Sequence, residues 1–166
     1  MKTIRLSCAH ALFKFLIAQK TIIDGKKVPL FPGAFAIYGH GNVACLGQAM
    51  EEFQSDLPGY RGHHEQSMAL SGIGYARAMR RKQIFIATSS SGPGAMNMVT
   101  AAGVALSNRL PLLLLPGDVF ASRFPDPVLQ QVENFNSPVE NQNDAFKPVS
   151  RFFDRITRPE QILNSL

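Results

Sequence analysis

The sequence predicts an α/β fold in three layers, with a mainly parallel sheet that carries helices on both faces. Three short apolar runs have the length and composition of buried strands, namely "AFAIYG" (34–39), "IFIAT" (84–88) and "PLLLLPG" (111–117). Residues 43–54, 64–81 and 95–108 have helical length, and the connections between elements are short. Strands that alternate with helices in this way form βαβ units, which place helices on both faces of one parallel sheet.

The N-terminal part of the chain predicts a helix followed by a loop. Apolar residues recur at helical spacing over residues 3–19, and Thr3 is the expected cap. Lys14 interrupts the apolar run and no small-residue cleavage site follows, which indicates an amphipathic helix and not a signal peptide. Residues 20–33 contain Asp24-Gly25 and Pro32-Gly33, pairs typical of turns, so we expect a loop there.

Three glycine-containing loops each follow a predicted strand: "GHGN" (39–42), "SSSGPG" (89–94) and "PGD" (116–118). Because the carboxyl ends of parallel strands meet at one edge of a sheet, we expect these loops to lie together, where open α/β sheets bind ligands. The short "GYRG" (59–62) is expected to be a further strand or an extended segment.

The sequence beyond Asp118 is rich in Pro, Asn and Gln and predicts a long surface excursion. We expect one helical turn over residues 128–133 and a last strand over residues 150–156. Thr157 and Glu160 have the spacing of a capping box at the start of a helix. A domain rarely ends where an amphipathic helix begins, so we expect residues 1–166 to be one domain of a longer protein.

The composition is that of a globular protein, with 45% hydrophobic and 17% charged residues. The net charge is +5, but the densest cationic group, residues 80–82, falls at a predicted helix end, where cations are favoured. This position favours a structural role over nucleic-acid binding. No run reaches the roughly 18 apolar residues of a membrane span, so no membrane partner is expected.

The two cysteines, Cys8 and Cys45, form neither a CxxC pair nor a metal-ligand spacing. We expect buried or free thiols in a reducing compartment, which favours a cytoplasmic location. No metal-ligating residue is predicted in this chain.

Glu65 stands in the first turn of the predicted helix 64–81, at the head of a face made mostly of small residues. Positions 65, 68, 69, 72, 76 and 79 share this face. Glu65 therefore has two interpretations. It is either a carboxylate that stabilises the helix N-terminus or a half-buried carboxyl group directed at a ligand. The helix alone favours the first.

Longer segments favour the second. The runs "YRGHHEQSMALSGIGYARA" (60–78), "IFIATSSSGPGAMNMVTAAGVA" (84–105) and "LPLLLLPGD" (110–118) resemble, in order and spacing, the pyrimidine-binding domain of thiamine diphosphate enzymes. The acetohydroxyacid synthase and decarboxylase group of that family carries similar runs, including "SGPGATN" after a strand. The resemblance covers nearly the whole chain and implies an N-terminal pyrimidine-binding domain.

The resemblance also implies site residues. In that family, the glutamate at the position of Glu65 shares a proton with a ring nitrogen of the cofactor's aminopyrimidine, so Glu65 is implied to be catalytic and to bind thiamine diphosphate. His40 is implied to transfer a proton near the substrate. The other candidates are cofactor-binding residues (His64, Gly92, Pro93 and Asn97) and residues of the substrate pocket (Gly39, Gly41, Asn42 and Gln66).

Some parts of such a site have to come from elsewhere. The family holds Mg²⁺ and the diphosphate with a "GDG" motif and a later asparagine pair, and "PGD" (116–118) is not that motif. The resemblance therefore places the metal and diphosphate ligands on another domain. It also implies a homo-oligomer, a dimer or tetramer, in which the diphosphate-binding domain of a second subunit completes each site.

Residues 3–19, 24–43 and 115–133 resemble one branch of the family most. These are hydrolases of inositol catabolism that open a cyclic 1,2-dione with water to give a 5-deoxyglucuronic acid. "HHEQS" (63–67) departs from the branch's usual Asn-Glu-Gln-Gly, which leaves an acetolactate synthase-like or other thiamine diphosphate-dependent lyase or transferase as an alternative.

Two classes without this chemistry stay open. One is a nucleotide-binding α/β domain, in which Gly92 and Gly94 would cradle a phosphate and Asp118 would follow the next strand. Pro93, which lacks an N–H group, and Asn97, in place of a third glycine, disfavour it. The other is a non-enzymatic interaction domain of similar fold.

Overall fold

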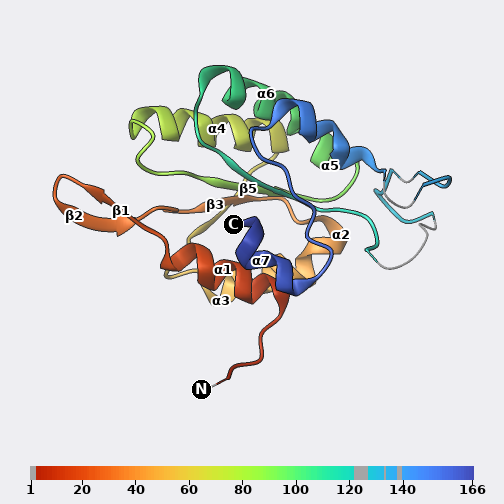
Figure 1. Cartoon of the computed structure of the whole chain (residues 1–166), viewed down its shortest axis with the longest axis horizontal. Coiled ribbons are helices and arrows are strands. Elements are labelled where there is room, and N and C mark those ends of the chain that lie inside the picture. Colours follow the sequence, from red (N-terminus) through yellow and green to blue (C-terminus); the bar gives the residue numbers. More distant parts are fainter. Residues whose placement is uncertain (1–2, 122–126, 133, 138–139) are drawn as a thin grey trace.

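The computed structural model describes residues 3–121, 127–132, 134–137 and 140–166. Its main sheet has four parallel strands in the order β4-β3-β5-β6. The two central strands, β3 and β5, lie side by side (Figure 1). The three apolar runs form its strands as predicted, and the short segment at 59–62 supplies an edge strand. The strands are β3 (Ala34–Ala36), β4 (Gly59–Arg61), β5 (Ile86–Ser89) and β6 (Leu113–Pro116).

Helices cover both faces of this sheet, which confirms the predicted three-layer α/β fold (Figure 1). One face carries α4 (Glu65–Ala78) and α6 (Val99–Asn108). The other carries α1 (Cys8–Ala18), α3 (Gln48–Glu52) and the C-terminal α7 (Ile162–Ser165).

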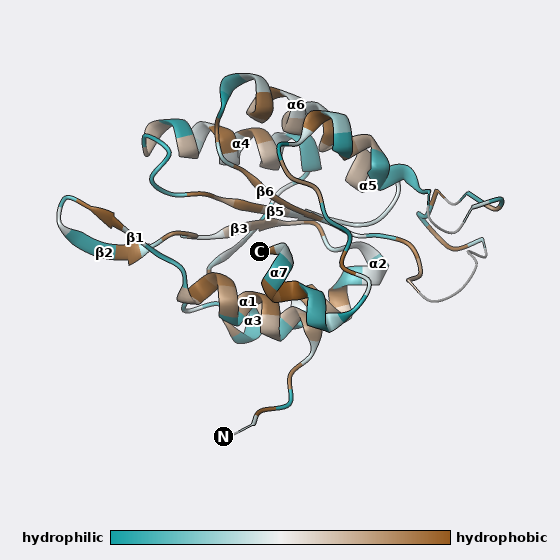
Figure 2. Cartoon of the chain, in the orientation of Figure 1, coloured by the Kyte–Doolittle hydropathy of each residue, from teal (hydrophilic) through white to brown (hydrophobic). Residues whose placement is uncertain are grey.

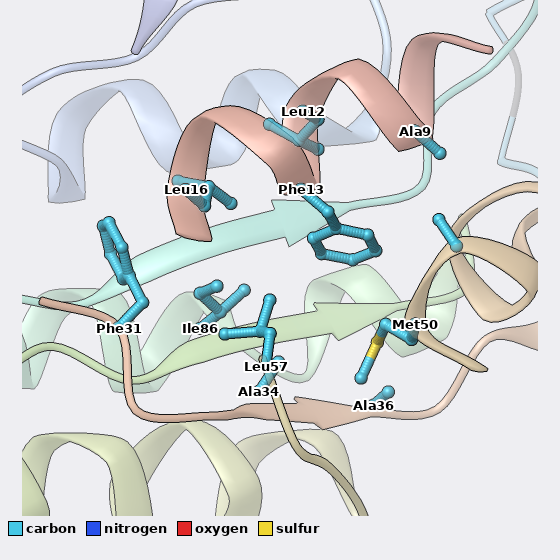
Figure 3. Packing of buried hydrophobic residues seen from close by; sticks show 11 residues of the cluster. Ala9, Leu12, Phe13, Leu16, Phe31, Ala34, Ala36, Met50, Leu57 and Ile86 are labelled. Carbon is cyan, nitrogen blue, oxygen red and sulfur yellow. The ribbon is translucent and has the colours of Figure 1, made fainter. Parts of the chain in front are cut away.

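Two buried clusters hold the layers together, and both include residues of the apolar central strands (Figure 2). On the α1 side, Phe13 and Leu16 pack with Met50, Leu57 and Ile86 (Figure 3). On the α4 side the cluster is made largely of alanines, which let the helices lie close to the sheet. Its fully or nearly fully buried members include Ala69, Ala87, Ala95, Met98, Ala101, Ala102 and Ala105.

The N-terminal prediction needs two corrections. The first helix begins at Cys8 and not at residue 3, because the Ser7 hydroxyl accepts the His10 N–H at 3.2 Å and so caps it. Residues 20–33 are not only a loop, since β1 (Lys20–Ile23) and β2 (Lys26–Pro29) pair as an antiparallel hairpin. Asp24 and Gly25 have φ of 48° and 77°, the pair of left-handed residues that a tight hairpin turn requires.

The small-residue face of α4 lies against the sheet as predicted, with Met68, Ala69, Gly72 and Ala76 buried. Met79 falls beyond the last turn of the helix, and Ile73 is the additional buried residue. The cationic group at residues 80–82 follows the helix end, where the Arg81 Nε donates to the Arg109 carbonyl at 2.8 Å. This contact ties the ends of α4 and α6 together.

The C-terminal part differs most from the prediction. Residues 150–156 form no strand, and a 3₁₀ helix that was not predicted, η2 (Gln142–Val149), precedes them. The expected helical turn at 128–133 is a hydrogen-bonded turn over residues 128–131, and Glu133 lies outside the described residues. A 3₁₀ turn, η3 (Pro159–Gln161), leads into α7. Gln161 and not Glu160 accepts the N–H groups of Thr157 and Arg158, at 2.8 and 2.9 Å.

Both cysteines are exposed and free, so of the two expected alternatives, buried or free thiols, the structure shows free ones. Partial burial of the Cys8 side chain raises the pKa of its thiol, and the nearby Cys45 raises this pKa further. Among the described residues, no helix has the length and apolar character needed to cross a membrane.

Candidate functional site

The three loops that follow β3, β5 and β6 meet at one edge of the sheet, as the sequence predicts. A Cβ added to Gly39 would lie 2.3 Å from the Ser90 Cβ, and one added to Gly117 would lie 2.7 Å from the Ser91 nitrogen. The Asn42 side-chain amide donates to the Ser89 carbonyl at 2.8 Å. The loops therefore pack closely, with only small or short side chains between them.

The first of these loops is helical, contrary to prediction. Residues 39–42 form a single helical turn, α2 (Gly39–Asn42), which continues through a π-helical stretch, η1 (Val43–Gly47), into α3. Gly39 has φ of 59°, a conformation that glycine adopts without strain. This conformation lets the chain turn directly from the end of β3 into the helix.

The second loop depends on Gly92. Its φ of 66° and ψ of −130° lie in a region open almost only to glycine. A Cβ at Gly92 would lie 1.6 Å from the Gln130 carbonyl oxygen, so no side chain can be accommodated. Pro93 then begins a short helix, α5 (Pro93–Met96), at a position where its missing N–H costs nothing.

Glu65 is half-buried in the first turn of α4, and its side chain reaches across to the end of α5. The Asn97 Nδ2 donates to the Glu65 Oε2 at 3.0 Å. The other oxygen, Oε1, accepts no hydrogen bond from the described residues and lies 3.0 Å from the position of a Cβ on Gly94. Two of the predicted cofactor-binding residues, 32 positions apart, are thus in direct contact.

The side chain of His40 is hydrogen-bonded to a residue other than Glu65. It is exposed, and its Nδ1 is 3.1 Å from the Gln130 Oε1. Gln130 was not among the residues singled out from the sequence, and only the return of a distant segment brings it to the site. It contacts the loops after both β3 and β5, through His40 and through Gly92.

Ser90 is the second residue that sequence reasoning missed. Its side chain is buried between Gly39 and Gly94, and its hydroxyl donates to the Ser91 carbonyl at 3.2 Å. A run of three serines after a strand is typical of a loop, so the sequence does not indicate that the middle serine is buried.

Among the described residues, no side-chain hydrogen bond joins Glu65 to the remaining candidates His64, Gln66 and Gly41. His64 is the exposed N-cap residue of α4 and makes no capping hydrogen bond with its side chain. Gln66 is half-buried on the first turn of the same helix, and Gly41 is exposed with no atom within 4 Å of a Cβ position. The structure thus brings Glu65 and Asn97 together and shows no comparable contact for these three.

A cavity of about 730 Å³ lies next to this edge, between the ends of β3 and β4 and the segment η1–α3. Of the predicted site residues it includes only Gly39, so it is not the space that Glu65 faces. Within the described ranges, no group of three or more His, Cys, Asp or Glu side chains lies close enough together to hold a metal ion.

Comparison with known proteins agrees with this geometry. Residues 33–137, which span all three strand-end loops, match the family described as "Thiamine pyrophosphate enzyme, N-terminal TPP binding domain". Curated relatives named 3D-(3,5/4)-trihydroxycyclohexane-1,2-dione hydrolase are similar along almost the entire chain. Those of Bacillus velezensis and Shouchella clausii are 53% and 54% identical to it over 165 residues, which is 99% of this chain and 26% of each relative.

The relative from Bacillus subtilis is 52% identical over 165 residues and has the same name. The chain spans about a quarter of the length of these relatives, 26% in each case. The family match alone covers more than half of the chain. With its parallel sheet, its converging strand-end loops and this match, the chain belongs to the thiamine pyrophosphate enzymes, through their N-terminal TPP binding domain.

Proposed function

We propose that this chain is the pyrimidine-binding domain of a thiamine diphosphate-dependent hydrolase that opens a cyclic 1,2-dione in inositol catabolism. The substrate is the trihydroxycyclohexanedione in the name of the relatives, which share 52–54% identity over nearly the whole chain. The observation that carries the proposal is the half-buried carboxyl group of Glu65, placed at the carboxyl edge of the sheet and bound by Asn97.

The surroundings of Glu65 suit recognition of a pyrimidine ring. One carboxyl oxygen accepts the Asn97 amide, and the other accepts nothing from the described residues. Gly94 presents no side chain beside that second oxygen, and a Cβ there would come within 3.0 Å of it. A carboxyl group that is fixed on one side and open on the other can donate its proton to a ring nitrogen.

Each predicted residue then has a role. When bound, thiamine diphosphate supplies a nucleophilic carbon and an electron sink for breaking a bond beside a carbonyl group. Glu65 shares a proton with the pyrimidine ring, and His64, Gly92, Pro93 and Asn97 line the ring's position. His40 transfers a proton at the substrate, beside a pocket formed by Gly39, Gly41, Asn42 and Gln66.

Other parts of the site belong to a second domain in this proposal. The ligands of Mg²⁺ and of the diphosphate come from a diphosphate-binding domain of a second subunit, so the active enzyme is a homo-oligomer. The chain would then be one domain of a longer enzyme, consistent with its 26% share of each relative's length. A cytoplasmic location stays a prediction.

The test uses the complete enzyme, meaning this chain joined to the remaining domains from its own gene or, by exchange of the matching residues, from the B. subtilis relative. We expect Glu65→Gln to slow exchange of the C2 proton of bound cofactor by about 100-fold or more, because the amide cannot share a proton with the ring. The thermal midpoint should stay unchanged. Glu51→Gln, an exposed change on α3, is the matched control.

Near-normal exchange in Glu65→Gln would disprove the role of the carboxyl group. The substrate is tested separately, by following ring opening of the dione and formation of acetolactate from pyruvate. Acetolactate formation without ring opening would establish the acetolactate synthase-like alternative instead.

A further inference from the structure

The contact between Glu65 and Asn97 distinguishes the two oxygens of the carboxyl group. Oε2 accepts the Asn97 Nδ2 at 3.0 Å, in a partly buried setting. Oε1 points toward Gly94 and Ser90, since a Cβ at Gly94 would lie 3.0 Å from Oε1 and 2.3 Å from the Ser90 Oγ. The Ser90 hydroxyl uses its hydrogen on the Ser91 carbonyl, and so it does not compete for Oε1.

A side-chain NH₂ group can only donate a hydrogen bond, so the oxygen facing it has to accept. A neutral carboxyl group carries a single hydroxyl, and its other oxygen remains an acceptor. If Oε2 accepts from Asn97, the proton of a neutral Glu65 is left on Oε1. A proton on Oε2 would instead face the amide hydrogens and lose the bond.

We infer that Asn97 is a positioning residue, which rests on the proposed function of Glu65. By donating to Oε2 it fixes the carboxyl orientation and assigns the proton to Oε1, the oxygen beside Gly94 and Ser90, which would donate it to a bound pyrimidine ring. The sequence resemblance places Asn97 against the cofactor, whereas the structure shows it bound to the carboxyl group itself.

The position of Asn97 fits this role better than a role confined to capping its own helix, α5. Its backbone N–H already closes α5 by donating to the Pro93 carbonyl at 3.0 Å. The side chain is therefore not needed to cap that helix. It is directed 32 residues back along the sequence, to the first turn of α4.

The first test is Asn97→Ala in the complete enzyme, with Asn108→Ala as control. Asn108 is exposed at the end of α6 and bonds to the Val104 carbonyl of its own helix, so its loss should leave exchange unchanged. We expect Asn97→Ala to slow exchange of the cofactor C2 proton about tenfold or more, because a freely turning carboxyl group presents its proton to the ring less often. The dissociation constant of thiamine diphosphate, measured by calorimetry with Mg²⁺, should change less than about threefold.

A second pair of variants tests the other oxygen without touching Asn97. Ser90→Ala removes the hydroxyl that a Cβ at position 94 would strike. When Gly94→Ala is then added, the new Cβ is in tight contact only with the Glu65 Oε1, at 3.0 Å. We expect the double variant to exchange the C2 proton at least about tenfold more slowly than Ser90→Ala alone, because the new methyl group would crowd Oε1, the oxygen proposed to donate the proton.

The outcomes separate this inference from the proposed function. If Glu65→Gln abolishes exchange but Asn97→Ala leaves it normal, the carboxyl role stands and the positioning role is wrong. If Asn97→Ala weakens cofactor binding but exchanges normally at saturation, Asn97 is only a binding residue, and the inference is again overturned. Equal exchange in the Ser90→Ala and double variants would place the donated proton on Oε2.

Discussion

The guanidinium of Arg155 donates from Nε to the Asp118 Oδ2 at 2.8 Å and thereby joins the C-terminal segment to the end of β6. Its Nη2 also donates to the Asp144 Oδ1, at 2.8 Å, and to the Asn141 Oδ1, at 3.0 Å. One side chain thus connects the loop after β6 with the start of η2. The buried Asn143 adds a second link to that loop by donating to the Gly117 carbonyl at 2.8 Å.

Loss of the Arg155 links should destabilise the domain. We expect Arg155→Ala to lower the free energy of unfolding by about 1–3 kcal/mol, because partly buried carboxylates lose charged hydrogen-bond donors. Arg151→Ala, a change at an exposed arginine of the same segment, is the matched control and should have little effect. Urea unfolding compares the two, and equal stabilities would refute the structural importance of the Arg155 contacts.

Asp144 should make stability depend on pH in acid. Partial burial raises the pKa of Asp144, but hydrogen bonds from Arg155, Lys147 and the Asn141 N–H outweigh it, so the pKa lies below the ordinary value of 3.8. A lowered pKa in the folded state means a stabilising contribution that is complete above the unfolded pKa and is lost as the pH falls through the folded one.

Asp144→Asn should therefore destabilise the domain near neutral pH and progressively less below about pH 4. Urea unfolding of both proteins across this range measures the difference. If Asp144→Asn lowers the free energy of unfolding equally at the acid end of the range, the charge of Asp144 is not what stabilises the fold.

His40 should affect turnover more than cofactor affinity. In the complete enzyme we expect His40→Ala to lower kcat about tenfold to 100-fold, since His40 is proposed to transfer a proton and is hydrogen-bonded to Gln130 and not to Glu65. The dissociation constant of thiamine diphosphate should change less than about twofold. His63→Ala, at an exposed histidine that precedes α4, controls for loss of an imidazole. Normal kcat with weakened cofactor binding would reverse the assigned role.

The 166-residue chain alone should bind thiamine diphosphate weakly and open no dione ring. The charge-assisted contacts to Mg²⁺ and diphosphate, which the proposal assigns to another domain, supply most of the affinity for such a cofactor. Calorimetry with cofactor and Mg²⁺ should give a dissociation constant above about 0.1 mM. Micromolar binding with measurable ring opening would show that the chain contains a complete site.

The sequence predicted the sheet well because each strand at its centre is a continuous apolar run between turn residues. It missed the β1–β2 hairpin because "KTII" and "KKVP" lack a clear apolar alternation, although the turn at Asp24-Gly25 was recognised. The strand expected at 150–156 was wrong for a different reason. Arg155 lies among apolar residues there, and its hydrogen bonds to Asp118, Asn141 and Asp144 hold the segment without any backbone ladder.

The candidate site residues could be singled out from the sequence one at a time, but the contacts between them could not. Glu65 and Asn97 could be singled out from family-like motifs, yet their hydrogen bond depends on how α4 and α5 lie relative to each other. Gln130 was not singled out, because a predicted helical turn at residues 128–133 does not indicate that this segment returns to His40 across 90 positions. Such contacts come from tertiary packing, which local patterns do not encode.

The crowding of glycines at the strand-end loops has a consequence for laboratory evolution of this domain. At Gly39, Gly92, Gly94 and Gly117, even the smallest side chain would strike a neighbouring atom at 2.7 Å or less. Random mutagenesis will therefore find these four positions intolerant. Variants with altered substrate range should instead arise where side chains already line the edge with room around them, as at His40 and Gln130, and libraries built there should retain the most folded members.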